Sequence, residues 1–443
     1  MSRLEEAFAD ELVVVGVHSG KFIAERDTDN IRAATRRLGM AHPVVNDRQF
    51  RTWRAFNVQA WPTVVLVGPD GQYIGQHSGE FSFDDFSSVI QVAIDSYSQS
   101  GLLSSKPLHL SPDPEPPSEA LLRFPGKVLC DAPGNRLFIA DTGHHRILVV
   151  SMDGERAEIT QIIGSGRAGF QDGSFSSAQL RAPEGMALHE ETLYIADTEN
   201  HSVRAADLTG GTVTTVAGNG EQGSYRSGGK GTQALLNSPW DLLAHDGHLY
   251  IAMSGSHQLW QMDLSTSEVG PFVGSGRESI EDGPNPRATL AQPSGLATDG
   301  SRLLFADSES SALRAADFLP TGYTQTLLGE GLFEFGDRDG KGMGMVRLQH
   351  CLGVTYHDGT VYIADTYNNK IKRYNMQSKE CLTALGSGEP SELYEPGGVD
   401  VWPGEDGATL YIADTNNHRV LASRINSEVS LLPAVPLRLS FSG

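Results

Sequence analysis

Short apolar runs followed by a polar turn recur along the last three quarters of the chain. Six segments share this pattern: LFIADTGHHRIL, LYIADTENHSVR, LYIAMSGSHQLW, LLFADSESSALR, VYIADTYNNKIK and LYIADTNNHRVL. Their acidic slot falls at Asp141, Asp197, Met253, Asp307, Asp365 and Asp414, in steps of 56, 56, 54, 58 and 49 residues. Each segment joins two β-branched or aromatic runs by a polar turn, which is typical of a hairpin. The repeat therefore predicts a mainly β fold, a six-bladed β-propeller.

A second repeated segment precedes each hairpin and is called the axial turn below. Its pattern resembles Pro-x-Gly-apolar, and its copies are Pro125–Val128, Pro183–Met186, Pro239–Leu242, Pro293–Leu296, Cys351–Val354 and Pro396–Val399. Proline has no backbone donor to leave unpaired, and glycine lets backbones approach closely. We therefore expect the innermost strand of each blade to begin here, beside the central channel. Cys351, in the place of a proline, is predicted to be a small buried thiol.

The period exceeds the roughly 40 to 45 residues of a common propeller blade, and the excess falls between the outer strand of one blade and the inner strand of the next. All such loops are expected to cross one face, where binding usually resides. The candidate binding residues near their ends are Arg167, Phe170, Asp172, Arg181, Glu184, Trp240, Asp241 and His350. The alternative is a structural rim in which these groups pair with one another.

The segment before the repeats reads as a separate domain. Residues 1–100 predict alternating strands and helices, with a buried strand in ELVVVGVHS, a helix capped by Thr28 and a final amphipathic helix. This order resembles the later part of the thioredoxin fold, and Trp61, Pro62 and Thr63 resemble its cis-proline segment. Residues 101–119 are rich in proline and predict a stiff linker, and 120–443 form the propeller.

The segment that resembles thioredoxin lacks the cysteines that carry out thioredoxin chemistry. In that family the Cys-x-x-Cys opens the helix that follows an earlier central strand, and here no cysteine precedes Cys130. The domain is therefore predicted to be partial and catalytically incomplete. A redox role requires a Cys-x-x-Cys upstream of Met1.

Composition narrows the class of protein further. The 443 residues carry a formal charge of −21, which argues against a nucleic-acid partner. No run approaches the 18 apolar residues of a membrane span, and the start has acids where a signal peptide has bases. Three cysteines far apart in sequence argue against a disulfide framework. A soluble protein in the cytoplasm is predicted.

Metal and hydrolase chemistry find little support. Asp337-Arg338-Asp339-Gly340 shares only the start of a calcium loop, and no His-x-x-x-His, paired-cysteine or Gly-x-Ser-x-Gly spacing occurs. The histidines at 144, 145, 201 and 418 are expected in turns on the side opposite the axial turns. No cofactor and no metal site are predicted.

The motif A-D-[TS]-x-N-[HN]-x-[IV], at Ala413–Val420 and closely at Ala364–Ile371, resembles the NHL repeat of six-bladed propellers. Its Asp and Asn are expected to accept backbone N–H groups as structural turn residues. The order HSGKF, NIRAA, HPVVND, WPT, FPGKV, ADTGHHRILVV, SPWD, QPSGL, ADSES, ADTNNH resembles the NHL repeat-containing protein 2 family over nearly the whole chain. That resemblance implies a thioredoxin-like domain joined to an NHL propeller, a cytosolic location and further C-terminal β structure.

Three functions follow as hypotheses. The first is a cytoplasmic scaffold that binds a protein or peptide on the loop-rich face of the propeller. The alternative is a thiol–disulfide oxidoreductase whose Cys-x-x-Cys lies upstream, and the third is a metal-dependent propeller hydrolase or lyase. Two segments, Leu108–Leu110 and Val429–Leu432, are candidates for completing the outer edge of the ring.

Overall fold

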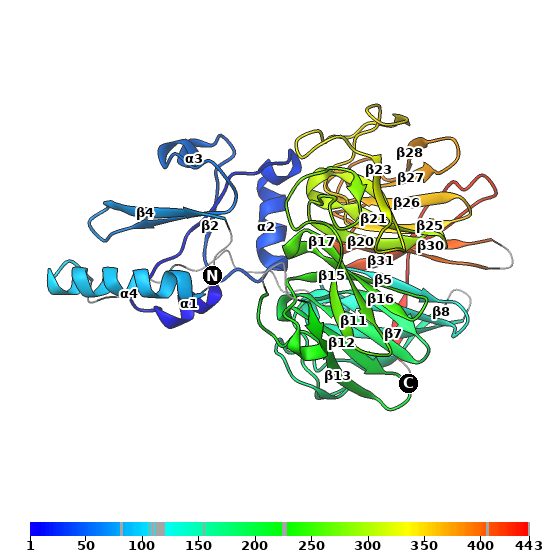
Figure 1. Cartoon of the computed structure of the whole chain (residues 1–443), viewed down its shortest axis with the longest axis horizontal. Coiled ribbons are helices and arrows are strands. Elements are labelled where there is room, and N and C mark those ends of the chain that lie inside the picture. The colour runs from blue at the N-terminus through cyan, green and yellow to red at the C-terminus, as the bar shows by residue number, and fades with distance from the viewer. Residues whose placement is uncertain are drawn as a thin grey trace. The chain divides into compact units, whose positions relative to one another are not determined.

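The computed structural model describes residues 1–79, 83–104, 106, 108, 110, 120–153, 156–223, 228–404 and 407–441. The chain divides into two compact units, Met1–Glu119 and Ala120–Gly443 (Figure 1). Most of the predicted linker, at 105, 107, 109 and 111–119, lies outside the described residues.

The first unit contains two small sheets and several helices. Its elements are α1 (Ser2–Ala7), β1 (Gly16–His18), the 3-10 turn Ala24–Arg26, α2 (Thr28–Arg37), β2 (Val44–Asn46), α3 (Arg51–Ala55), β3 (Thr63–Val67), β4 (Tyr73–Ser78) and α4 (Phe83–Gln99). Strands β1 and β2 pair in parallel, and β3 and β4 pair antiparallel. The Trp61–Pro62 peptide bond is cis, as predicted. The indole N–H of Trp61 donates to the carbonyl of Ser19 at 2.8 Å.

Two predictions for this unit were wrong. The strand in ELVVVGVHS is confined to β1, and Val13, Val15 and Val17 are 40%, 44% and 43% exposed instead of buried on both faces. The cause is that β1 has one strand partner among the described residues, β2. The cap of α2 is Asp27, whose side chain accepts from two backbone N–H groups of the first turn, and Thr28 is the first helical residue.

The second unit is a ring of six blades, each a small antiparallel sheet, which confirms the predicted propeller. The first blade has β5 (Val128–Asp131), β6 (Arg136–Asp141), β7 (Arg146–Asp153), β8 (Arg156–Ile163) and, at its edge, β33 (Leu439–Phe441). The second has β10 (Pro183–His189), β11 (Thr192–Asp197), β12 (Ser202–Asp207), β13 (Thr212–Ala217) and β9 (Gly173–Ser174). The third has β15 (Pro239–His245), β16 (His248–Met253), β17 (Gln258–Asp263), β18 (Glu268–Val273) and β14 (Gly229–Lys230).

The remaining blades follow the same order from the axis outward. The fourth has β20 (Pro293–Thr298), β21 (Arg302–Asp307), β22 (Ala312–Asp317), β23 (Tyr323–Leu328) and β19 (Gly283–Pro284). The fifth has β25 (Gly353–His357), β26 (Thr360–Asp365), β27 (Lys370–Asn375), β28 (Glu380–Leu385) and β24 (Gly340–Lys341). The sixth has β29 (Gly398–Trp402), β30 (Thr409–Asp414), β31 (Arg419–Arg424) and β32 (Val435–Pro436). Six 3-10 turns join second and third strands: Thr142–His144, Thr198–Asn200, Ser254–Ser256, Ser308–Ser310, Thr366–Asn368 and Thr415–Asn417; a seventh, Gly231–Gln233, follows β14.

The innermost strands β5, β10, β15, β20, β25 and β29 contact one another in sequence around the axis, and β29 contacts β5. The last 3-10 turn closes the ring, since the hydroxyl of Thr415 donates to the carbonyl of Pro125 at 2.9 Å. The same bond joins earlier neighbours, as from Thr142 to Pro183 at 2.8 Å. Closure therefore repeats an ordinary contact between blades.

Of the two segments predicted to complete the outer edge, Leu108–Leu110 falls partly outside the described residues, and Val429–Leu432 pairs only at the end of β31, where the N–H of Leu432 donates to the carbonyl of Arg424 at 2.9 Å. Leu108 and Leu110 belong to no strand, and position 109 lies outside the described residues. Val429–Leu432 forms a bend with a single bridge at Leu431. The chain instead supplies β32 to the sixth blade and then β33, which pairs in parallel with β8 of the first blade. The C-terminal segment thus spans the two blades that meet at the closure.

The long period has a structural cause that the sequence did not reveal. Each loop leading into blades two to five carries a two-residue strand, β9, β14, β19 or β24, which pairs with the outer strand of the blade that follows. The step from Asp365 to Asp414 is the shortest because the sixth blade gains no such strand from its preceding loop. Much of the extra length therefore widens the sheets.

The axial glycines confirm the predicted close approach of backbones. A Cβ added to Gly185 would lie 2.3 Å from the Cα of Asp241, and one added to Gly398 would lie 2.8 Å from the Cα of Lys127. A Cβ on Gly353 would meet the carbonyl oxygen of Gly397 at 2.9 Å. Backbone atoms cannot yield as a flexible side chain can, so these contacts set how closely the blades assemble.

We predict that Gly185→Ala destabilises the propeller by about 1–3 kcal/mol or more, because the new methyl group overlaps the backbone of the next blade. The measurement is the free energy of unfolding in urea. Gly283→Ala is the matched control, since Gly283 also lies in a strand but a Cβ there meets nothing within 4 Å. Equal effects of the two substitutions would contradict this view of the axis.

Candidate functional site

The acidic slot binds the backbone of the axial segment. Each slot side chain accepts from the N–H of the residue two positions before the axial turn, at 2.7 Å for Arg123, Arg181, Ala291, Gln349 and Tyr394. All five carboxylates are fully buried. The predicted structural role of these acids is confirmed. Asn200 differs from the prediction, because its amide donates to the carbonyl of Gly169 and to Asp197.

A basic side chain on the third strand compensates each buried acid, and the sequence reasoning missed it. Arg204 contacts Asp197 at 2.7 Å, Arg314 contacts Asp307 at 3.0 Å, and Lys372 lies 3.8 Å from Asp365. In the first and sixth blades the base sits two residues earlier, at Arg146 and Arg419. The signal was available as a base five or seven residues after each acid.

The third blade replaces the ion pair by apolar groups. Met253 takes the place of the acid and Trp260 the place of the base, and both pack in one buried cluster. The sulfur of Met253 still accepts from the N–H of Asn237, at 3.3 Å. A buried ion pair can often be replaced by well-packed apolar residues. The third blade has such an apolar pair where the other blades have an ion pair.

The predicted binding residue Asp172 and the acids of the partial calcium loop are engaged inside the fold. Asp172 pairs with Arg204 at 2.7 Å and accepts from both the N–H and the hydroxyl of Thr215. The ammonium group of Lys372 lies between Asp337, at 2.7 Å, and Asp339, at 2.9 Å, where the partial calcium loop would need its ion. In the described part of the chain no cluster of three or more His, Cys, Asp or Glu side chains could hold a metal.

A second bond between blades starts at the residue that follows each 3-10 turn. This residue has a left-handed backbone and accepts from the N–H just before the next axial turn: His145 from Ala182, His201 from Ser238, His257 from Gln292, Ser311 from His350, Asn369 from Glu395 and His418 from Phe124. The prediction that these histidines lie opposite the axial turns was wrong. Antiparallel pairing returns the second strand to the end at which the first began.

The hydrogen bonds require these imidazoles to be neutral at Nδ1. Burial, assisted by the positive charge of Arg181, lowers the pKa of His201 from 6.5 to about 4. Burial also lowers the pKa of His145, with smaller contributions from Arg123 and Arg181. Protonation therefore competes directly with a contact that joins two blades.

The other predicted binding residues divide between the axis and the outer loops. Gly185 and Asp241 contact through their backbones, so Glu184 and Trp240 project from neighbouring axial turns. Arg167, Phe170 and Arg181 are exposed on the loop from blade one to blade two, and Phe170 packs over the guanidinium of Arg204 at 5.1 Å. His350 stacks on Tyr367 with ring centroids 4.3 Å apart. The eight residues do not form one cluster of side chains.

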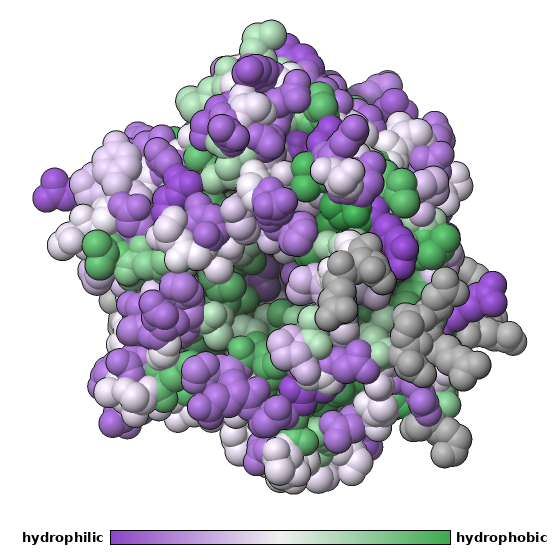
Figure 2. All heavy atoms as spheres, turned by 90° about the vertical axis from the view of Figure 1, so that its right-hand side faces the viewer, coloured by the Kyte–Doolittle hydropathy of each residue, from purple (hydrophilic) through white to green (hydrophobic). Residues whose placement is uncertain are grey.

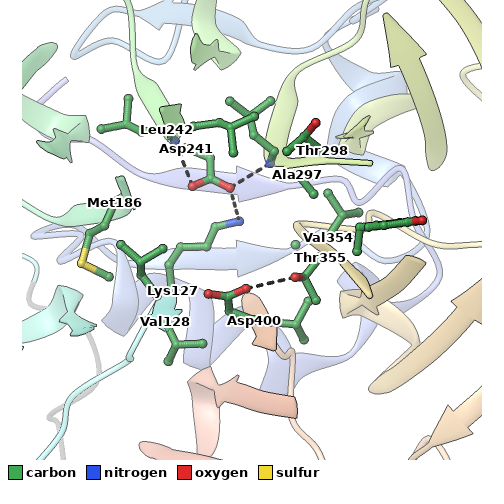
Figure 3. A pocket seen from close by; sticks show the side chains of 16 residues that line it. Lys127, Val128, Met186, Asp241, Leu242, Ala297, Thr298, Val354, Thr355 and Asp400 are labelled. Carbon is green, nitrogen blue, oxygen red and sulfur yellow. Dashed lines mark hydrogen bonds and ion pairs between the residues drawn. The ribbon is translucent and has the colours of Figure 1, made fainter. Parts of the chain in front are cut away.

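Lys127 spans the channel at the level of the axial turns. It occupies the glycine place of the first turn, and Asp241 occupies that of the third. The Lys127 ammonium donates to the carbonyls of Ser294 and Leu352 and lies 3.6 Å from Asp241 (Figure 3). Burial raises the pKa of Asp241, and Lys127 opposes that rise. Predicted as a binding residue, Asp241 is thus paired inside the channel.

Beyond Lys127 the channel opens into a cavity of about 210 Å³. Residues of all six inner strands line it, from the axial turns to Thr298 and Tyr356 near the opposite strand ends. Figure 2 shows a hollow at the centre of the ring, with hydrophobic residues around its wall.

We call the face at which the inner strands begin the long-loop face and the face at which they end the hairpin face.

Asp400 is the second carboxylate of this cavity. It accepts from the N–H groups of Cys130 and Val401, at 2.7 and 2.8 Å, and from the hydroxyl of Thr355 at 3.0 Å (Figure 3). Burial raises the pKa of Asp400 to about 6 against these donors. The same carboxylate and burial raise the pKa of the Cys130 thiol. Cys130, Cys351 and Cys381 are all unpaired, and Cys351 is fully buried as predicted.

Comparison with known proteins reveals relatives over almost the whole chain. It is 42% identical to "Protein SUPPRESSOR OF QUENCHING 1, chloroplastic" of Arabidopsis thaliana over 94% of this chain and 41% of that protein. It is 39% identical to NHL repeat-containing protein 2 of Bos taurus and of Homo sapiens, over 97% of this chain and 64% of those proteins. The chain therefore spans less than two thirds of the length of these curated relatives.

More distant similarities are weaker. Protein DipZ of Mycobacterium tuberculosis is 28% identical over 67 residues. Among solved structures, virginiamycin B lyase from Staphylococcus aureus gives a TM-score of 0.44 at 10% identity, covering 72% of this chain and 89% of that one. A chain of the nidogen/laminin complex gives 0.41 at 17%, covering 59% and 80%. No protein-family profile matches the chain. In its described part, no helix is both long and apolar enough to cross a membrane.

We predict that Arg204→Leu lowers the free energy of unfolding by about 3–5 kcal/mol, because it leaves Asp197 buried without its cation. The double variant Asp197→Met with Arg204→Trp copies the third blade and is expected to recover most of that loss. Urea unfolding of Asp197→Met, of Arg204→Trp and of the double variant measures the coupling between the two positions. A double variant as unstable as the sum of the singles would contradict the equivalence of the two pairs.

We also predict that acid weakens the contact made by His201. Its folded pKa of about 4 lies below the unfolded value of 6.5, so the unfolded chain binds more protons between these values and stability falls as pH drops from 6.5 toward 4. The expected loss is up to about 3 kcal/mol, at about 1.4 kcal/mol per pKa unit. His201→Asn is the control, because Asn369 fills the same place in the fifth blade without titrating. A wild-type minus His201→Asn difference that stays constant with pH would refute this assignment.

Proposed function

The chain belongs to the family of NHL repeat-containing protein 2, and from that premise we propose that it binds a protein or peptide segment on the long-loop face of its propeller. Long loops carried by a rigid ring are where repeat proteins usually bind their partners. A reducing, cytoplasmic setting is part of the same proposal, and three unpaired cysteines support it.

One observation carries the proposal. The loop from the fourth to the fifth blade, residues 329–350, holds three large apolar side chains in solvent: Phe333, Met343 and Met345 are 66%, 60% and 57% exposed. The loop begins at the long-loop face and runs along the outer edge of the fifth blade, where the N–H of Gly342 donates to the carbonyl of Lys379 in the turn between β27 and β28. Met343 and Met345 therefore extend the proposed surface from the long-loop face over that edge. Exposed apolar groups mark interaction sites, and flexible methionines suit an apolar partner. None of these three residues is among the binding residues predicted from the sequence.

The loop holds these side chains in a fixed backbone. The guanidinium of Arg338 donates to the carbonyl of Met345 at 2.6 Å and also to that of Gly344. Arg347 pairs with Glu330 at 2.6 Å across the base of the loop. A surface that is ordered before binding loses less entropy when a partner docks, which favours affinity.

The residues predicted from sequence extend the proposed surface. Arg167, Phe170 and Arg181 are exposed on another loop of the same face, and Trp240 is half-buried at the axis. Aromatic and arginine side chains are the groups that most often dominate binding energy. The formal charge of −21 favours a partner segment that is basic as well as apolar.

A thiol–disulfide oxidoreductase is the alternative, and the resemblance of Trp61, Pro62 and Thr63 to a segment of the thioredoxin fold supports it. Trp61 also packs against Trp53 with ring centroids 4.5 Å apart, next to the strand that follows the proline. Residues 1–129 contain no cysteine, so this function needs thiols encoded before Met1. Reading the genomic DNA upstream for an in-frame Cys-x-x-Cys separates the two proposals. The third hypothesis, a metal-dependent hydrolase or lyase, requires stoichiometric metal in elemental analysis.

We predict that Met343→Asp with Met345→Asp lowers affinity for the partner at least tenfold, because it places two charges in an apolar contact. The partner is first identified by photo-crosslinking from an unnatural amino acid at position 343 and is then purified for titration. Arg181→Ala with Trp240→Ala tests the other residues of the surface in the same titration.

Leu319→Asp is the matched control for this experiment. Leu319 is 64% exposed but lies in the turn between β22 and β23 of the fourth blade, outside the loop of residues 329–350. The substitution adds a charge at similar exposure and should leave affinity unchanged. Equal loss from the two substitutions, or unchanged affinity after Met343→Asp with Met345→Asp, would count against the proposed surface.

A further inference from the structure

Two polar residues line the channel cavity at a position where the other blades have apolar residues, and assembly of the ring does not require them. At the position two residues beyond the glycine place, the cavity is lined by Leu129, Leu243, Ala297, Thr355 and Asp400. The first four blades place an apolar residue there, Ala187 in the second blade included, and the adjoining fifth and sixth blades place polar ones. Thr355 and Asp400 are hydrogen-bonded to each other at 3.0 Å.

The hydrogen bonds of Asp400 account for a hydrogen-bond acceptor at this position. They do not account for a charged side chain there. Its carboxylate links three blades through Cys130, Thr355 and its own strand. Asp241 makes similar bonds to Leu242 and Leu296, and there the cation Lys127 balances the charge. For Asp400 no Lys, Arg or His of the described residues lies within ion-pair distance. A buried carboxylate is costly without a positive partner.

The size and lining of the cavity limit what the positive partner can be. Its volume of about 210 Å³ is below the roughly 300–1,000 Å³ of pockets for drug-sized ligands. Lys127 and the axial turns close one end, so a ligand must enter from the hairpin face. Leu129, Leu243 and Val354 offer an apolar wall beside Asp400. A short aliphatic chain with a charged head matches that combination, as buried lysine stems do elsewhere.

We propose that this cavity, called the channel cup, binds a primary ammonium group carried on a short aliphatic chain, with the ammonium at Asp400 and the methylene groups against the apolar wall. The source is either a free aliphatic amine or the side chain of a lysine presented by another protein. The site is distinct from the proposed partner surface, because the cup is lined by the inner strands at the axis whereas Met343 and Met345 lie at the outer edge of the fifth blade.

The experiment titrates the whole chain, labelled with ¹³C at its methyl groups, with n-pentylammonium chloride. We expect saturable shifts of the Leu129, Leu243 and Ala297 methyl signals, and little response to the neutral isostere pentan-1-ol. Asp400→Asn removes the charge and should weaken the amine at least tenfold. Absence of saturable shifts in the wild type, or equal binding to Asp400→Asn, would overturn the proposal.

A second variant keeps the test valid if Asp400→Asn unfolds. Leu243→Phe fills the cup and retains the carboxylate, so it should also weaken n-pentylammonium at least tenfold while thermal unfolding remains cooperative. Binding that survives with a filled cup would refute the location. The blocked peptide Gly-Gly-Lys-Gly-Gly distinguishes the sources: binding equal to or tighter than that of the amine supports a protein lysine, and binding of the amine alone supports a small molecule.

Discussion

Neighbouring blades approach so closely at the axis that their backbones touch, and the rest of the propeller follows from this contact. No Cβ fits at Gly185, Gly353 or Gly398 without meeting the next strand. Backbone donors in such a crowded segment have no access to water and need partners in the protein. The acidic slot supplies one acceptor from within the blade, and the residue after the 3-10 turn supplies another from the preceding blade. Closing the ring therefore uses the bonds that hold each pair of blades.

Because the blades are copies of one another, residues needed for the fold can be distinguished from residues that serve another role. A group that recurs in the same role in most blades, such as Asp197 or His201, is explained by assembly of the ring. A departure is explained when a second change compensates it, as Trp260 does for Met253 and Lys127 does for Asp241. Asp400 departs from the repeat without a compensating charge among the described residues. Such positions are where a ring built from copies can acquire a ligand.

The sequence predicted some features well because they depend on local periodicity. Alternating apolar runs and constant spacing specify hairpins and their number, and a glycine in a repeated turn specifies close packing. The two-residue strands such as β9 escaped prediction because they are too short to show any period. The paired bases, such as Arg204 and Lys372, escaped because they do not keep one place in the repeat: the base lies seven residues after the acid in three blades and five in two. Exposed Met343 and Met345 escaped because exposure depends on how the whole loop folds back, which no short window records.

By itself the sequence determined the architecture: six repeats, their order of strands, the division from the N-terminal segment and the structural use of the acidic slots. The tertiary structure alone decided which charges are balanced and which apolar groups remain in solvent. The reason is distance along the chain. Hairpin pairing joins residues that are near in sequence, whereas the partners of Lys127, Asp172 and Asp400 come from other strands and loops and meet them only when the ring is assembled.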